Sequence, residues 1–208
     1  MGSFITLEGP DGSGKTTQAQ LLVGWLRDQG HDVLLTREPG GTEIGNQIRD
    51  VLHDSDNDAM DPRTEFLLYS ASRAQHVSEL ILPSLAAGKL VVSDRYADSS
   101  LAYQGYGRGL DLEMLQKVTD FATQGLKPDL TLYFDIAPGE GLQRRLISGE
   151  EWNRMDAEAL AFHRRVRAGY LELAAAEADR WEILDANRPI EDVQSDVRAA
   201  LAEHLGNV

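Results

Sequence analysis

Apolar and polar positions follow a repeating order along this chain. Five short apolar runs are each followed by a segment with apolar residues three and four positions apart. The runs fit buried parallel strands, whose two faces are both covered, and the segments fit helices. We expect the strands at residues 4–8, 33–36, 90–94, 130–135 and 181–185. The alternation predicts an α/β fold of three layers, αβα, around a five-stranded parallel sheet.

Boundary residues place the helices between these strands. Asp61-Pro62 is a start signal, with Asp as the N-cap and Pro in the first turn, and this helix should run to about Leu82. Pro83 should kink or end it. The glycine-rich segment 105–109 is expected to be a loop, and a long helix is expected over about 156–178. A further helix is marked by the apolar residues Leu112, Leu115, Val118 and Phe121.

Length and composition narrow the class of protein. With 208 residues, 42% of them hydrophobic, the chain is expected to form one domain over 1–208 around one sizeable core. It has no cysteine, which excludes disulfides and thiolate catalysis and fits a reducing cytoplasm. No apolar run reaches 18 residues, and the N-terminus has the pattern of a strand rather than a signal peptide. We therefore expect a cytoplasmic protein with no membrane partner.

The charge of the chain limits its partners further. The formal net charge is −14, so a nucleic acid polymer or an anionic membrane would be repelled. A small phosphorylated substrate remains compatible with this charge, because it arrives with Mg²⁺ and meets local arginines. The simplest role of the acidity is to keep the protein soluble.

The stretch after the first predicted strand fits the pattern G-x-x-x-x-G-K-[ST] and opens a helix. Its glycines let the backbone turn sharply and point N–H groups at an anion, beside a helix N-terminus. Lys15 adds a charge for the outer phosphates, and the Thr16 hydroxyl can bind Mg²⁺. The predicted nucleotide-binding residues are Gly9, Pro10, Asp11, Gly12, Ser13, Gly14, Lys15, Thr16 and Thr17.

A phosphate-binding loop alone does not separate kinases from GTPases or other ATPases. The guanine motif Asn-Lys-x-Asp is missing, which argues against a GTPase. Arg37 and Arg95 follow predicted strands, and Arg73 lies on a predicted helix with Phe66 and Tyr69 on the same face. Ligands of open α/β sheets bind outside the carboxyl ends of the strands. Converging arginine forks there indicate a second, phosphorylated substrate.

Several motifs resemble those of the bacterial thymidylate kinase family, nearly from end to end. They are LEGPDGSGKTT at 7–17, TREPGGT at 36–42, DRY at 94–96, SSLAYQG at 99–105 and KPDLTL at 127–132. The stretches REPGG and AYQG are specific to this family among nucleotide kinases. The resemblance implies a P-loop NTPase-type fold, transfer of the γ-phosphoryl group of ATP to dTMP, and a homodimer formed through helix faces such as that of residues 62–82.

The resemblance also implies a role for each substrate-binding position. Tyr69 would stack on thymine, which is worth roughly 1–3 kcal/mol per base in nucleic-acid binders. Tyr103 would exclude a 2′-hydroxyl group, and Asp11 would receive the 3′-hydroxyl. Arg73 would contact a base carbonyl, while Arg37 and Arg95 hold the dTMP phosphate. The complete predicted set is Asp11, Arg37, Glu38, Pro39, Tyr69, Arg73, Arg95, Ser100, Tyr103 and Gln104, with the last and Ser100 facing the base edge or sugar.

Catalysis would consist of positioning and charge neutralisation, because the acceptor phosphate is already ionised at pH 7. Thr16 and Asp94 are the predicted Mg²⁺ ligands. Related kinases place an arginine near the transferred phosphate, either within the glycine loop or on a lid. The glycine loop of this chain has Ser13 at the place for that arginine, so a mobile lid over about 139–155 must supply it. Arg144, Arg145 and Arg154 are available there. The predicted catalytic residues are Lys15, Arg95, Arg144 and Arg154.

Two other functions compete with this interpretation. A deoxynucleoside kinase would phosphorylate a sugar hydroxyl and would need a general base, for which Glu38 is placed. Such an enzyme would not need the three arginines. A non-catalytic regulator that binds ATP would keep the glycine loop and would need no second pocket.

Overall fold

The computed structural model describes residues 2–148 and 154–206 of the chain. Its centre is one five-stranded sheet in the order β2-β3-β1-β4-β5, and every neighbouring pair is parallel. The predicted αβα fold with a parallel sheet is confirmed. The strands are β1 (Phe4–Glu8), β2 (Val33–Arg37), β3 (Leu90–Asp94), β4 (Leu130–Asp135) and β5 (Trp181–Asp185).

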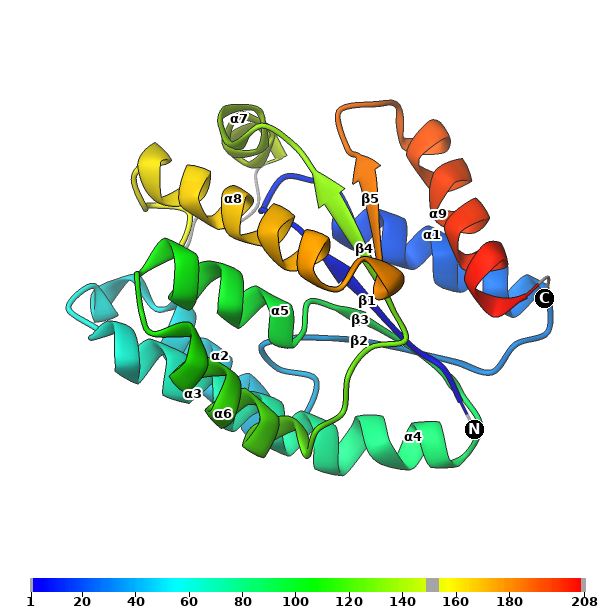
Figure 1. The fold of residues 1–208 in the computed structure, drawn as a ribbon, viewed down its shortest axis with the longest axis horizontal. Coiled ribbons are helices and arrows are strands. Elements are labelled where there is room, and N and C mark those ends of the chain that lie inside the picture. Colours follow the sequence, from blue (N-terminus) through cyan, green and yellow to red (C-terminus); the bar gives the residue numbers. More distant parts are fainter. Residues whose placement is uncertain (1, 149–153, 207–208) are drawn as a thin grey trace.

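Helices cover both faces of this sheet (Figure 1). On one face α1 (Lys15–Asp28) packs against α9 (Ile190–Leu205), and their apolar sides join Ile5 and Leu7 of β1 in the largest core cluster. On the other face α8 (Leu160–Ala176) buries Tyr170 against Tyr133 of β4, with ring centroids 4.9 Å apart. The alternation of apolar runs in the sequence is explained by this double cover.

The segment after β2 forms a pair of neighbouring helices. α2 (Glu43–His53) begins at Thr42, whose hydroxyl accepts a hydrogen bond from the backbone N–H of Gly45 at 3.0 Å. A short turn, η1 (Ser55–Asn57), leads to α3 (Pro62–His76), which begins at the predicted Asp61 cap and packs along α2.

Of the two outcomes expected at Pro83, a kink or an end of the helix, the second is wrong, because the helical run continues past Pro83 to Ala86. α3 passes into the π-helical turn η2 (Val77–Ile81) and then into α4 (Leu82–Ala86). Pro83 falls in the first turn of α4, where a missing N–H is tolerated. The wider π turn supplies the change in hydrogen bonding that a proline requires.

The glycine-rich segment 105–109 is not a simple loop either. After α5 (Ala97–Ser100) the chain forms the π-helical segment η3 (Leu101–Gly107). A Cβ atom on Gly105 would lie 2.4 Å from Leu112, and one on Gly107 would lie 2.6 Å from Phe162. These glycines therefore permit close packing of helices rather than a turn.

The remaining helices lie between β3 and β5 in the sequence. α6 (Leu112–Thr123) forms as predicted, although Phe121 is 87% exposed. α7 (Pro138–Ser148) follows β4, and η4 (Ala178–Arg180) precedes β5. The long helix predicted over 156–178 is α8, which begins at Leu160 and ends at Ala176. Residues 149–153 of the predicted lid lie outside the described residues.

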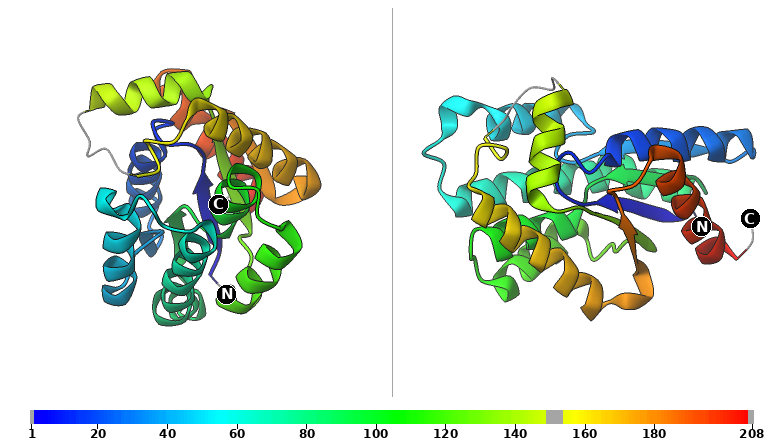
Figure 2. Two further views of the ribbon diagram at one scale, coloured as in Figure 1. Left: turned by 90° about the vertical axis from the view of Figure 1, so that its left-hand side faces the viewer. Right: turned by 90° about the horizontal axis from the view of Figure 1, so that it is seen from above.

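α7 lies directly on the glycine loop, beyond the ends of β1 and β4 (Figure 2). Gly12 has a φ angle of +77°, and a Cβ there would lie 2.0 Å from the carbonyl oxygen of Gly141. Only glycine fits both the left-handed backbone and this approach. Across the part of the chain that the structure describes, no helix combines the length and apolar character needed to cross a bilayer.

Candidate active site

A cavity of about 340 Å³ opens where β1, β2 and β3 end. It brings together side chains from segments far apart in the sequence, as expected at the carboxyl edge of a parallel sheet. The predicted residues on its wall are Asp11, Lys15, Thr16, Arg37, Glu38, Pro39, Tyr69, Asp94, Arg95, Ser100, Tyr103 and Gln104. The wall also includes Arg145, one of the three candidate lid arginines, and four residues that were not predicted at the site: Arg49, His53, Ser99 and Met155.

The glycine loop carries its lysine close to its own backbone. Gly14 takes a left-handed conformation and precedes α1, which begins at Lys15. The ammonium of Lys15 donates to the carbonyl of Pro10 at 2.8 Å and is 3.4 Å from the hydroxyl of Ser13. Burial, with the neighbouring charge of Arg95, lowers the pKa of Lys15 to about 8. Thr17, in the first turn of α1, is exposed and lies outside the cavity wall.

Two oxygen ligands for a divalent cation meet beside the lysine. Thr16 is the second residue of α1. Asp94 is the last residue of β3, the strand that pairs with β1. The Thr16 hydroxyl donates to a carboxylate oxygen of Asp94 at 2.7 Å. A hydroxyl and a carboxylate are hard oxygen donors that suit Mg²⁺, which keeps its other positions for water and phosphate oxygens. The residues present therefore fit this ion.

Arg95 occupies the centre of the site in an unusual backbone conformation. Its φ angle is +72°, a region that non-glycine residues rarely adopt. The guanidinium donates to the Gly9 carbonyl at 2.9 Å and to Asp11 at 2.8 Å, and its carbon lies 5.2 Å from the centre of the Tyr103 ring. Although burial opposes it, the charges of Arg95 and Lys15 hold the pKa of Asp11 well below its usual range.

A buried carboxylate behind Arg95 fixes this conformation. Glu8 accepts hydrogen bonds from the backbone N–H of Tyr96 at 2.7 Å, from Ser99 at 2.6 Å and from Tyr170 at 2.8 Å. Burial and the nearby Asp98 raise the pKa of Glu8 to about 7. The sequence identified Glu8 only as a charged strand end, and Tyr170 carried no signal because it lies in a long helix.

A second group of arginines lines the far side of the cavity. Arg37 is exposed at the end of β2, and Arg49 of α2 donates to the carbonyl of Pro39 at 3.0 Å. Burial, together with the charge of Arg37, lowers the pKa of Arg49. Such a pair of guanidinium groups suits a phosphate. Arg49 stands on the polar side of a helix, which in sequence resembles any solvated arginine.

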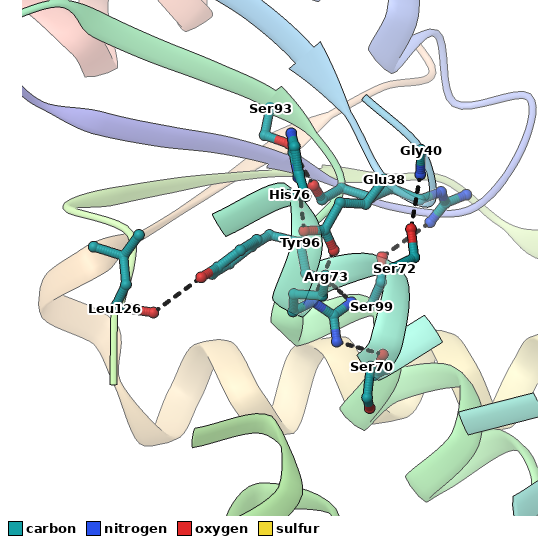
Figure 3. A network of polar contacts seen from close by, with 12 residues as sticks. Glu38, Gly40, Ser70, Ser72, Arg73, His76, Ser93, Tyr96, Ser99 and Leu126 are labelled. Atoms are coloured by element: carbon teal, nitrogen blue, oxygen red, sulfur yellow. Dashed lines mark hydrogen bonds and ion pairs between the residues drawn. The ribbon is translucent and has the colours of Figure 1, made fainter. Parts of the chain in front are cut away.

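Arg73 is buried and is not part of the cavity wall; Figure 3 shows its polar neighbours, among them Glu38 and Tyr96. Only 1% of it is exposed, and it donates to Glu38 at 2.7 Å, to Ser100 at 3.0 Å and to the Tyr96 carbonyl at 3.0 Å. The other oxygen of Glu38 lies 3.0 Å from Nδ1 of His76. The structure therefore shows Arg73 holding Glu38 and Ser100, two residues of the cavity wall, and its contact with a base carbonyl stays a prediction.

Part of the cavity wall is aromatic. Tyr69 of α3 and Tyr103 of η3 line it with Met155 and Gln104. Burial, with the Glu65 carboxylate nearby, raises the pKa of Tyr69 to about 12, so its ring stays neutral. Flat neutral rings in a half-buried chamber suit the face of a nucleobase.

The three arginines near the lid point in different directions. Arg144 donates to the Ala186 carbonyl and to Asn187, both at 2.8 Å. Arg154 is buried, and its guanidinium lies 2.5 Å from Glu65. Arg145 lines the cavity and lies 3.3 Å from Asp156. Of the predicted catalytic residues, Lys15 and Arg95 thus meet at the cavity, whereas Arg144 and Arg154 lie outside its wall.

The cavity has a phosphate cradle at one end and a cationic, aromatic chamber at the other, without a wall between them. Two phosphorylated ligands bound this way would face each other, and the chain is a P-loop nucleoside monophosphate kinase. A family model described as thymidylate kinase matches residues 7–197, and the chain belongs to that family.

Similar proteins support this assignment along the whole chain. A thymidylate kinase of Roseiflexus sp. (strain RS-1) is 48% identical over 219 residues, which cover 100% of this chain and 97% of the relative. The crystal structure of thymidylate kinase from Ehrlichia chaffeensis superposes with a TM-score of 0.77 at 33% identity, covering 96% of this chain and 98% of that one.

Proposed function

We propose that this protein transfers the γ-phosphoryl group of ATP to dTMP, giving dTDP and ADP in nucleotide biosynthesis. The observation that carries the proposal is the shared cavity. Lys15 and Thr16 stand at one end, Arg37 and Tyr69 at the other, and Arg95 between them touches the glycine loop through Gly9. Both phosphates would therefore approach the same guanidinium group.

On the donor side, the loop 9–17 would surround the phosphates of ATP. Thr16 and Asp94 would hold Mg²⁺, which supplies positive charge to the phosphate oxygens. Lys15 would leave the Pro10 carbonyl for the outer phosphates. Burial and the charge of Arg95 lower the pKa of Lys15, and a bound phosphate would stabilise its ammonium form.

On the acceptor side, Arg37, Arg49 and Arg95 would hold the dTMP phosphate. Its oxygen attacks without a general base, because it is already ionised. Arg145 is the lid-side arginine on the cavity wall, and we assign it the transition-state contact, for which the sequence left Arg144, Arg145 and Arg154 as candidates.

The nucleoside of dTMP would occupy the aromatic end. Tyr69 would stack on thymine, with Ser100 and Gln104 at the base edge. The ring of Tyr103 would leave no space for a 2′-hydroxyl group. Asp11 would accept from the 3′-hydroxyl with the carboxylate that Arg95 already orients.

The two alternative functions are not favoured. A deoxynucleoside kinase would use Glu38 as a base, but both of its oxygens are bound, one by Arg73 and one by His76. Both oxygens of Glu38 are therefore already engaged in holding Arg73 and His76 in place. A regulator that only binds ATP would not need the second chamber with its arginines.

We further propose that residues 1–208 act as one domain with a lid at about 139–155, and that two copies associate through α2, α3 and α6. A cytoplasmic location agrees with a cysteine-free chain. Large apolar side chains are exposed on these three neighbouring helices, at Ile44, Val51, Leu67, Met114 and Phe121.

A direct assay tests the reaction. Purified protein is given ATP, Mg²⁺ and either dTMP or thymidine, and ADP release is followed together with nucleotide products by chromatography. We expect dTDP from dTMP and no product from thymidine. Phosphorylation of thymidine without turnover of dTMP would support the nucleoside kinase instead, and ATP binding without turnover of either would support the regulator.

A further inference from the structure

A fully buried carboxylate stands directly behind the aromatic end of the cavity. Glu65 of α3 is 0% exposed, and it is held by three side chains from later parts of the chain. Arg108 donates to both of its oxygens, at 3.2 and 3.0 Å. The guanidinium of Arg154 lies 2.5 Å from Oε2, and Nε2 of Gln104 donates to Oε1 at 2.7 Å.

This carboxylate is ionised in the folded protein. Burial alone would raise the pKa of Glu65, but the hydrogen bonds from Arg108 and Gln104 and the charges of Arg108 and Arg154 hold it below its ordinary value. An ionised carboxylate can only accept hydrogen bonds. It therefore selects one of the two possible orientations of the Gln104 amide, the one with the NH₂ group toward Glu65.

The consequence for the cavity concerns the other atom of that amide. Gln104 is part of the cavity wall, beside Tyr69 and Ser100. With Nε2 engaged by Glu65, the amide oxygen Oε1 accepts no hydrogen bond from the residues that the structure describes. The wall therefore offers a fixed acceptor to the edge of a bound base.

We propose that Glu65 is the positioning residue that sets base selection, by presenting the Gln104 oxygen to the cavity as an acceptor. This inference rests on the proposed binding of dTMP. Thymine and uracil carry a donor, the N3–H group, at the centre of their pairing edge, whereas cytosine carries an acceptor there. An acceptor fixed in the wall pairs with the first kind of base and repels the second.

The arginines make the orientation rigid. In a free glutamine the amide can rotate by half a turn and exchange its two ends. Arg108 and Arg154 both approach Oε2, so this oxygen cannot be replaced by a donor without an unfavourable contact. Glu65 and Gln104 thus keep one arrangement, and cytosine is disfavoured because its N3 atom is a hydrogen-bond acceptor facing another acceptor, rather than because of its size.

The test is a single-atom exchange, Glu65→Gln. Oε2 has the two closer guanidinium contacts, at 2.5 Å from Arg154 and 3.0 Å from Arg108, so the amide oxygen would stay there. The new NH₂ group would replace Oε1, lose the 3.2 Å hydrogen bond from Arg108 and face Gln104. The amide of Gln104 must then turn its oxygen toward position 65 and its NH₂ group toward the cavity. Values of kcat/KM are measured for dTMP, dUMP and dCMP, since dUMP keeps the N3–H group and lacks only the methyl group.

We expect the ratio of kcat/KM for dTMP over dCMP to fall by about tenfold or more, as a misdirected buried amide costs about 1–3 kcal/mol. The ratio of dTMP over dUMP should stay within about twofold. The matched control is Glu158→Gln, at the carboxylate that holds the other side of Arg108 at 2.5 Å. It should leave both ratios unchanged.

A purely structural role for Glu65 would lower turnover of all three nucleotides together, and an unchanged dTMP-to-dCMP ratio in a folded variant overturns the inference. If Glu65→Gln does not fold, Glu65→Asp keeps the charge for the arginines and withdraws the acceptor from Gln104. A ratio that falls by threefold or more then supports the inference, and an unchanged ratio overturns it. Lack of dTMP turnover in the unsubstituted enzyme would instead contradict the proposed function.

Discussion

At the scale of single residues, the site depends on groups that hold other groups in place. Arg95 has a left-handed backbone at +72°, which costs free energy unless its surroundings compensate. Glu8 compensates for it by accepting the N–H of Tyr96, the next residue, at 2.7 Å. Its second oxygen orients Ser99, which in turn lies 3.3 Å from the guanidinium of Arg95.

We therefore expect Glu8→Gln to reduce kcat/KM for dTMP by about 10- to 100-fold, because small displacements of a clamping arginine are costly. The KM for ATP should stay within about threefold, since Lys15 and Thr16 are not bound to Glu8. Steady-state kinetics with each substrate varied in turn measure both values. Glu177→Gln, at a carboxylate paired with Lys127 and Arg180 away from the cavity, serves as the control. Equal losses for both substrates would contradict this role of Glu8.

The lysine of the glycine loop predicts a dependence on pH. Its pKa is lowered to about 8, so the charged form that binds phosphate is lost as the pH rises through that value. We expect kcat/KM for ATP, at saturating dTMP, to decline above pH 8 by up to tenfold per pH unit. His53 has its pKa lowered to about 4 by burial and by Arg49, so it stays neutral in this range.

The control for this profile is Lys15→Arg, whose guanidinium remains charged between pH 7 and 9. That variant should be less active overall, and its remaining activity should not decline between those values. A decline of the same shape in both proteins would assign the titration to another group.

At the scale of whole elements, the glycine loop and α7 form one unit. Gly12 and Gly141 touch through their backbones, so the residues of α7 are placed relative to the phosphates with little freedom. Neighbouring residues of a helix point about 100° apart. Arg145 can therefore reach the cavity while Arg144 holds the segment after β5 through Ala186 and Asn187.

This difference predicts that alanine substitutions of the two adjacent arginines lower kcat by very different factors. Arg145→Ala should lower kcat by about 10³-fold, as loss of a transition-state arginine does in other phosphoryl-transfer enzymes. Arg144→Ala should lower kcat by less than tenfold, because its loss loosens α7 without removing a charge from the wall. Single-turnover kinetics separate the chemical step from product release. A larger loss for Arg144→Ala than for Arg145→Ala would reverse the assignment.

The elements themselves could be predicted to different degrees from the sequence. The strands were located because a buried parallel strand leaves an uninterrupted apolar run. The π-helical segments η2 and η3 were not, because Pro83 and the glycines at 105 and 107 carry the same local signals as a kink and a loop. Their real causes are distant partners, such as Phe162 against Gly107, which no local pattern contains.

At the scale of the whole molecule, the residues predicted at the site were mostly those inside short, unusual motifs. Motifs placed Lys15, Arg37 and Arg95 at the cavity because strand ends converge in any parallel sheet. Arg49 and Glu65 lie on ordinary amphipathic helices, and only the packing of α2 against α3, and of α3 against η3, shows which way they point. A charged residue on a helix, such as Glu65, does not reveal in the sequence that its partner is Arg108, which lies about forty residues further along the chain.

The exposed apolar side chains of α2, α3 and α6 predict that two copies of the chain associate through these helices. Phe121 is 87% exposed, Met114 58% and Leu67 56%, and α3 packs between the other two helices (Figure 1). The same helices α2 and α3 carry Arg49 and Tyr69 to the cavity. A second copy covering these side chains would bury apolar surface and stabilise the wall of each site.

We expect the protein to have about twice its chain mass of 22.9 kDa by light scattering coupled to size exclusion. Phe121→Asp and Leu67→Asp should shift it to the mass of one chain, with little effect on folding of that chain because both side chains are exposed. Leu21→Asp, at an exposed leucine of α1, should leave the mass unchanged. A single-chain mass before any substitution would refute the dimer, and dissociation by Leu21→Asp alone would move the interface to α1.

If dimer formation supports the cavity wall, the two dissociated variants should also bind dTMP more weakly at low protein concentration, and raising the concentration should restore binding.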